Sequence, residues 1–168
     1  MDLNKPRQFN EFNYKINREL LRDCPGFINQ FSFLPLTKIL DVEGLFNSNQ
    51  YDSLERAIID FIITKKVDLL IVSIEDLYPY ENFEEFSENQ SIDWNVGSRY
   101  ENGGVLIVLS KSKNESYVTI NKRLKDKINE KVCDDILKNT GQPEFEKGYY
   151  FKGLLLSIEA LKSTIEGN

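Results

Sequence analysis

The feature that most constrains the fold is a nearly continuous apolar run from Val67 to Ile74 (VDLLIVSI). Its length and its β-branched residues are typical of a strand that is buried on both faces. A second buried strand is predicted at Val105–Leu109, and a third at Tyr117–Ile120, after a polar turn. Strands buried on both faces require helices above and below the sheet, so these runs predict an α/β layered fold.

Helical periodicity appears between and after these strands. Asn47 and Gln50 have the spacing of a capping box, which predicts a helix over 49–64. Apolar residues at helical spacing predict three further helices, in the segments 83–94, 128–137 and 150–165, and we expect Gly141 and Pro143 to stop the second of them.

These elements predict a three-layer α/β/α sandwich with a small mixed sheet. A right-handed crossover makes the strands at 67–74 and 105–109 parallel, and the short turn makes 105–109 and 117–120 an antiparallel hairpin. We expect this domain to span 36–165, opened by a short extended segment at 36–40. An N-terminal helical extension, 1–35, is predicted from the spacing of Phe9, Phe12, Ile16 and Leu20.

The amino-acid composition excludes several classes of function. The chain has 168 residues, a net charge of −6 and no histidine. The charge argues against nucleic-acid binding, and the missing histidine excludes Ser-His-Asp and Cys-His catalysis. Carboxylates and amides remain, which suit calcium or magnesium, and we expect no organic cofactor. With neither a signal peptide nor a run of about 18 apolar residues, we expect a cytoplasmic monomer without a transmembrane segment.

The predicted hairpin brings acidic residues together at one end of the sheet. Glu101 precedes its first strand, whereas Asp126, Glu130 and Asp134 follow its second strand, so all four belong to the same end. A cation would offset the repulsion among these carboxylates. Simple solvation, or ion pairs with Lys125, Lys127 and Lys131, would offset it equally well.

The ordered motifs resemble those of TPM domains, a family that includes a plant thylakoid acid-phosphatase-like protein and many bacterial proteins. The resemblance covers about 36–165. It rests on Asp41-x-x-Gly44-Leu45-Phe46, Leu54-Glu55 before the first buried strand, Trp94-Asn95-Val96-Gly97, Glu101-Asn102-Gly103-Gly104-Val105-Leu106-Ile107, and Pro143-x-Phe145-x-x-Gly148-x-Tyr150.

This resemblance implies an α/β/α sandwich with an acidic metal site at one end of the sheet, calcium being the usual ion. By motif position, the implied ligands are Asp41, Glu101 and Glu130. One segment departs from the family: Asn121-Lys122-Arg123-Leu124-Lys125 stands where the family has Gly-Tyr-Gly-Leu-Glu. Cations beside the site weaken metal affinity, and they attract a phosphate or an acidic partner instead.

Two functions follow. The first is a binding or assembly module for an unidentified protein partner, with a weakened divalent-cation site; the replaced segment 121–125 favours it. The alternative is a metal-dependent, low-turnover phosphomonoesterase of the acid-phosphatase type. There, calcium or magnesium on Asp41, Glu101 and Glu130 would polarise the phosphate and lower the pKa of an attacking water.

Overall fold

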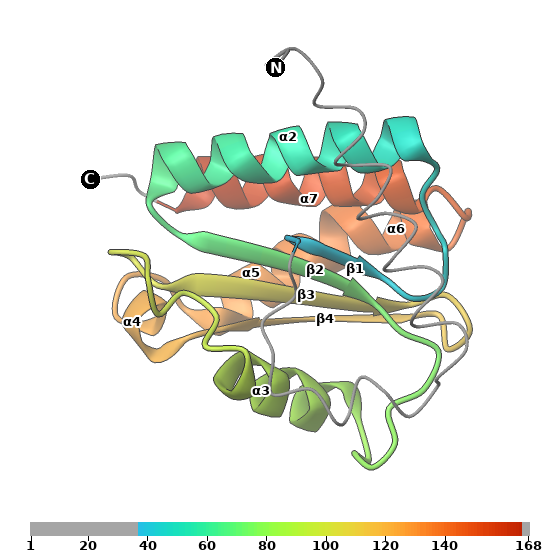
Figure 1. Cartoon of the computed structure of the whole chain (residues 1–168), viewed down its shortest axis with the longest axis horizontal. Helices are drawn as coiled ribbons and strands as arrows, with labels where there is room; N and C mark the ends of the chain where they lie inside the picture. Colours follow the sequence, from blue (N-terminus) through green and yellow to red (C-terminus); the bar gives the residue numbers. More distant parts are fainter. Residues whose placement is uncertain (1–36, 166–168) are drawn as a thin grey trace, which may run out of the picture.

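A computed structural model describes residues 37–165 of the chain (Figure 1). The predicted extension at 1–35 lies outside the described residues. The elements, in chain order, are β1 (Ile39–Asp41), α2 (Ser48–Lys65), β2 (Asp68–Ser73), α3 (Phe83–Asp93), β3 (Gly104–Ser110), β4 (Glu115–Ile120), α4 (Lys122–Lys125), α5 (Glu130–Ile136), the π-helix η2 (Leu137–Gly141), α6 (Gln142–Phe145) and α7 (Tyr150–Thr164).

The four strands form one mixed sheet in the order β1-β2-β3-β4. β1 pairs with β2 in parallel, and β2 pairs with β3 in parallel, with Leu69 opposite Val105. β3 and β4 are antiparallel, with Val105 opposite Ile120. The parallel pairing predicted for the first two buried strands and the predicted hairpin are both confirmed.

This topology gives the sheet two distinct ends. At the upstream end, β2 and β3 begin and β4 finishes, so Asp68, Gly104 and Ile120 lie near one another. At the downstream end, β1, β2 and β3 finish and the β3–β4 turn lies beside them. Side chains of the candidate site therefore meet only if they belong to the same end.

Two hydrophobic cores cover the two faces of the sheet, as expected for strands without a polar face. Alternate residues of β2 and β3, such as Leu69 and Ile107, pack with α2, α7 and the 130–145 helices. The intervening residues, such as Leu70 and Leu106, pack against α3. Figure 1 shows α3 on one side of the sheet and α2 with α7 on the other, which confirms the three-layer sandwich.

The helix boundaries follow the capping chemistry of the sequence. Both hydrogen bonds of the Asn47–Gln50 capping box form, so α2 begins at Ser48, and Asn82 caps α3 through the Glu85 N–H. The predicted stop at Gly141 and Pro143 is wrong: the helical chain continues through η2 and α6 to Phe145. Pro143 lies in the first turn of α6, where its missing N–H costs little.

No helix within 37–165 has both the length and the apolar character to cross a membrane. The longest, α2, has 18 residues, and charged side chains such as Asp52, Arg56 and Asp60 interrupt it.

Candidate functional site

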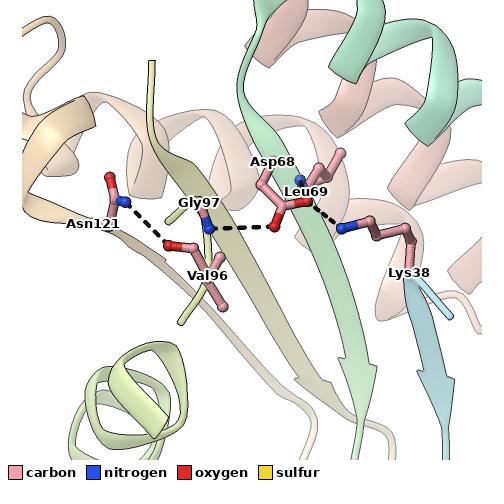
Figure 2. Close-up of polar contacts among 6 residues, drawn as sticks. All are labelled: Lys38, Asp68, Leu69, Val96, Gly97 and Asn121. Atoms are coloured by element: carbon pink, nitrogen blue, oxygen red, sulfur yellow. Dashed lines mark hydrogen bonds and ion pairs between the residues drawn. The ribbon is translucent and has the colours of Figure 1, made fainter. Parts of the chain in front are cut away.

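The upstream end of the sheet is organised around Asp68, the first residue of β2. Its side chain is almost fully buried, yet it accepts hydrogen bonds from the Lys38 ammonium at 2.5 Å, the Gly97 N–H at 3.2 Å and the Leu69 N–H at 3.0 Å (Figure 2). A buried carboxylate is tolerated only when it is paired in this way. Asp68 therefore fastens the residue before β1 and the loop after α3 to the start of β2.

Asp68 was not among the predicted site residues. The signal was present in the sequence, because an acid inside the apolar run 67–74 must find partners. Nothing in the sequence identified Lys38 and Gly97 as those partners, since they lie 30 and 29 residues away along the chain.

The glycines of the motif segments allow backbone to pack directly on backbone. Gly97 has φ +76°, and a Cβ atom there would lie 2.2 Å from the Gly104 nitrogen. A Cβ atom at Gly103 would lie 2.2 Å from Oδ1 of Asn121. These contacts bring the 94–97 loop, the start of β3 and the start of α4 together, so the motifs serve the fold at this point.

Asn121 joins the same loop to α4. Its Oδ1 accepts the Leu124 N–H at 3.1 Å as the helix N-cap, and its Nδ2 donates to the Val96 carbonyl at 3.0 Å (Figure 2). One side chain thus satisfies a helix terminus and a loop carbonyl at once. The segment that departs from the family pattern is therefore firmly attached to the domain.

Glu130, a predicted metal ligand, binds groups of its own chain. One oxygen accepts the Thr119 hydroxyl at 3.0 Å and the Ile120 N–H at 3.1 Å, and the other pairs with Lys125 at 2.7 Å. Burial raises the pKa of Glu130, but the bonds from Lys125, Ile120 and Thr119 together hold it below its ordinary value. Glu130 also satisfies an outward N–H of the edge strand β4.

Glu101, the second predicted ligand, is exposed in the turn before β3, and it makes no hydrogen bond or ion pair with the described residues. It lies at the upstream end, as does Glu130, because Val105 and Ile120 are opposite each other. The geometric part of the prediction, that these two acids share one end of the sheet, agrees with the register.

Asp41, the third predicted ligand, lies at the downstream end. Its carboxylate accepts the Leu45 N–H at 2.9 Å, the Phe46 N–H at 3.0 Å and the Ser73 hydroxyl at 2.6 Å. Asp41 is in register with Ser73, which pairs with Leu109. Leu109 is four residues along β3 from Val105, or roughly 13 Å at the rise of a strand.

The structure therefore does not bring Asp41 together with Glu101 and Glu130. Across 37–165, no three acidic or cysteine side chains stand close enough to share a metal ion. A single calcium or magnesium ion held by all three residues does not fit this arrangement. Binding of a cation by fewer of them stays a prediction.

Glu43 is a further carboxylate that the sequence analysis missed. It accepts the Lys111 N–H at 2.7 Å and the Ser112 N–H at 3.0 Å, which fixes the β3–β4 turn to the loop after β1. Burial raises the pKa of Glu43, partly offset by these two hydrogen bonds. Its partners are 68 and 69 residues away, so sequence spacing gave no signal.

An open groove runs between α3 and the β4–α4 segment at the upstream end and has a volume of about 880 Å³. Its cationic residues, Lys122, Arg123 and Lys125, belong to the segment 121–125 that departs from the family pattern. Its acidic residues are Glu88 and Asp126. Arg123 is held in place by donating to the Tyr100 carbonyl at 2.6 Å. Ile92 of α3 lines the groove with 73% of its surface exposed. We call this feature the α3–α4 groove.

The groove has the chemistry of a binding surface. Its charged groups are permanent cations and carboxylates, and its Ser98 and Asn95 side chains add hydrogen-bonding groups. Cys133 does not supply a nucleophile, because burial raises the pKa of its thiol to about 12. The arrangement can attract an anion to the α4 side and an apolar group to Ile92.

Comparison with known proteins identifies the fold. The family model described as "TPM domain" matches residues 39–164. A search of curated proteins finds no match to this chain.

Three solved structures share the fold. The N-terminal domain of a protein from P. gingivalis has a TM-score of 0.66 and 20% identity, over 75% of this chain and 80% of that one. The N-terminal domain of the cg2496 protein from Corynebacterium glutamicum has a TM-score of 0.63 and 12% identity, over 78% of this chain and 81% of that one. The BA42 protein from Bizionia argentinensis has a TM-score of 0.64 and 15% identity, over 74% of this chain and 83% of that one.

Proposed function

The chain belongs to the TPM domain family, and starting from that membership we propose that it is a non-catalytic binding module whose α3–α4 groove holds a negatively charged partner. The observation that carries the proposal is the charge reversal at the groove. Lys122, Arg123 and Lys125 line it, where the resemblance leads one to expect a tyrosine, a glycine and a glutamate. Anions are attracted to such a wall and divalent cations are repelled.

The hydrogen bonds of the predicted ligands support a non-catalytic role. Asp41 accepts from three donors, and Glu130 accepts from two donors and pairs with Lys125. A cation that took these oxygens would leave buried N–H groups without partners, at a cost of about 1–3 kcal/mol each. Of the three, only Glu101 presents an exposed carboxylate.

A hydrolysis assay tests the non-catalytic part of this function. Purified full-length protein is incubated with p-nitrophenyl phosphate in calcium, in magnesium and with EDTA, alongside the Glu101→Gln and Glu130→Gln variants. We expect each rate to equal that of a buffer blank. Hydrolysis that disappears with EDTA and falls in both variants would establish the phosphomonoesterase instead.

Polyglutamate titration tests the binding part. We expect saturable backbone amide NMR shifts centred on residues of α4 in the wild-type protein, and their loss when Lys122 and Arg123 are both changed to Glu. The matched control is Lys113→Glu, because Lys113 is an exposed lysine in the β3–β4 turn at the other end of the sheet. Shifts that survive the double change, or an absence of shifts, would contradict binding at this groove.

A further inference from the structure

Resting on the binding function just proposed, we propose the chemistry of the partner: a short acidic segment of another protein that also carries an aliphatic side chain. Its carboxylates contact Lys122 and Arg123 on the α4 side of the groove. Its aliphatic side chain covers Ile92 on the α3 side.

The cationic side of the groove is preorganised. Arg123 uses one nitrogen to donate to the Tyr100 carbonyl, which leaves other guanidinium donors for a carboxylate. The Lys122 side chain makes no hydrogen bond or ion pair with residues 37–165. Both follow Asn121, whose bonds to Val96 and Leu124 fix the start of α4. Arg123, held by its bond to Tyr100, therefore loses less side-chain entropy when an anion binds than an unattached cation does.

The α3 side of the groove presents a different surface. Ile92 is 73% exposed, and Glu88 lies one helical turn before it on the same face. A single exposed isoleucine is ordinary on a protein surface. Here it lies in a groove that the buried Val96 and Ile120 also line, where an aliphatic group of a ligand can remove it from water.

The charges also fix the orientation of the partner. Glu88 repels a carboxylate on the α3 side, whereas on the α4 side Lys122 and Arg123 outnumber Asp126 and attract one. The acidic and aliphatic groups of the segment must therefore lie on opposite sides of its backbone, as alternate residues of an extended peptide do.

A peptide fits the groove better than an inorganic anion or a nucleic acid. A volume of about 880 Å³ is large for one phosphate ion, which would leave Ile92 exposed. A nucleic-acid backbone carries a phosphate at every nucleotide, so it would place charge against Glu88 and Ile92, where the peptide presents an aliphatic side chain.

The test uses full-length protein and three capped peptides of about eight residues. One alternates glutamate with leucine, one replaces glutamate with glutamine, and one replaces leucine with serine. Amide NMR shifts locate each binding site, and calorimetry gives the affinity. We expect the glutamate–leucine peptide to bind at the groove, and each of the others to bind about tenfold more weakly.

Variants sharpen this test. Changing Lys122 and Arg123 together to Glu should weaken binding about tenfold or more, and Ile92→Ser should weaken it about tenfold. Glu88→Gln should tighten binding up to about fivefold, because it removes a repulsion. Ile59→Ser on α2, another exposed isoleucine, and Lys113→Glu should leave the affinity unchanged.

Several results would overturn the inference. These are equal affinity for all three peptides, no peptide binding, weaker binding in Glu88→Gln, or inorganic phosphate binding at the groove while the peptides do not. If polyglutamate still binds through Lys122 and Arg123 in such a case, the binding function stands and only the partner chemistry fails. Metal-dependent hydrolysis would reject the function itself.

Discussion

At the scale of single residues, three partly or fully buried carboxylates accept hydrogen bonds from backbone, hydroxyl and ammonium donors of the domain. Asp41 binds two N–H groups and a hydroxyl, Asp68 binds two N–H groups and an ammonium, and Glu130 binds one of each. Charge-assisted hydrogen bonds of this kind are stronger than those between neutral groups. These three acids therefore stabilise the folded domain.

The pH dependence of stability should report the role of Glu130. Because its pKa is lower in the folded protein than its ordinary value of 4.5, Glu130 stabilises the fold above the pKa of the unfolded chain. This contribution is lost as pH falls through the folded-state pKa. We expect Glu130→Gln to lower the free energy of unfolding by about 1–2 kcal/mol near neutral pH, and by progressively less as the pH falls below 4.5. Urea unfolding across this range measures it.

Glu88→Gln is the matched control for that measurement. The exposed side chain of Glu88 makes no hydrogen bond or ion pair with any described residue, so Glu88→Gln should change the free energy of unfolding by less than about 0.5 kcal/mol. A constant difference between wild type and Glu130→Gln over the whole range would contradict a role for the ionised carboxylate.

At the scale of elements, the contact of the 94–97 loop with the start of β3 is a close backbone contact near the groove. It depends on the absence of side chains at Gly97, Gly103 and Gly104, where a Cβ atom would meet backbone or Asn121 within 3 Å. Such contacts adapt poorly, because Gly104 is the first residue of β3 and the Gly97 N–H is bonded to the buried Asp68.

Two glycine-to-alanine substitutions distinguish the cost of backbone strain at positive φ from the cost of a steric clash of the added Cβ atom. Gly97 and Gly148 both have positive φ, at +76° and +80°, but a Cβ atom at Gly148 meets nothing within 4 Å. We expect Gly148→Ala to cost about 1–2 kcal/mol of unfolding free energy, from backbone strain alone. Gly97→Ala should cost at least about 2 kcal/mol more, from the clash with Gly104.

Thermal and urea unfolding of the two variants provide the comparison. Equal destabilisation would mean that the loop can move away from β3. The 94–97 loop would then be a poor support for one side of the groove.

The elements themselves were largely predictable, because local chemistry determines them. The apolar run 67–74 and the Asn47–Gln50 capping box each depend on neighbours in the chain, and both predictions are confirmed. The continuation through Gly141 was not predictable. Gly141 and Gly153 allow Phe145 and α7 to approach closely, a tertiary contact that overrides the helix-stop signal.

At the scale of the whole molecule, the direction of the strands explains which of the predicted ligands could be located from the sequence. Glu101 and Glu130 were placed from the geometry of a hairpin, and both lie at the upstream end. Asp41 was placed by motif position alone. Its strand runs parallel to β2 and β3, which carries it to the downstream end. Pairing at 32 residues' separation, as between Ile39 and Ile71, leaves no local trace.

The separation of the three carboxylates predicts how the molecule responds to divalent cations. A cation at a hundred times its dissociation constant would stabilise the fold by about 2.7 kcal/mol. We expect millimolar calcium or magnesium to leave the Tm equal to that in sodium chloride of the same ionic strength, with no change on adding EDTA. Differential scanning calorimetry measures both.

A saturable rise in Tm that EDTA reverses would contradict this expectation. Its loss in Glu101→Gln, but not in Glu88→Gln, would assign the site to the upstream end and restore the metal ligand predicted there.

The order of the strands has a consequence for the speed of folding. Each strand pairs only with its neighbours along the chain, and the β3–β4 hairpin joins residues as close as Ser110 and Glu115. Closing short loops first lowers the entropic barrier, so the hairpin is a natural nucleus. β1 is only three residues long, and Glu43, two residues after it, accepts two N–H groups of the hairpin turn. Native contacts at β1 should then form after the transition state and govern how slowly the folded chain comes apart.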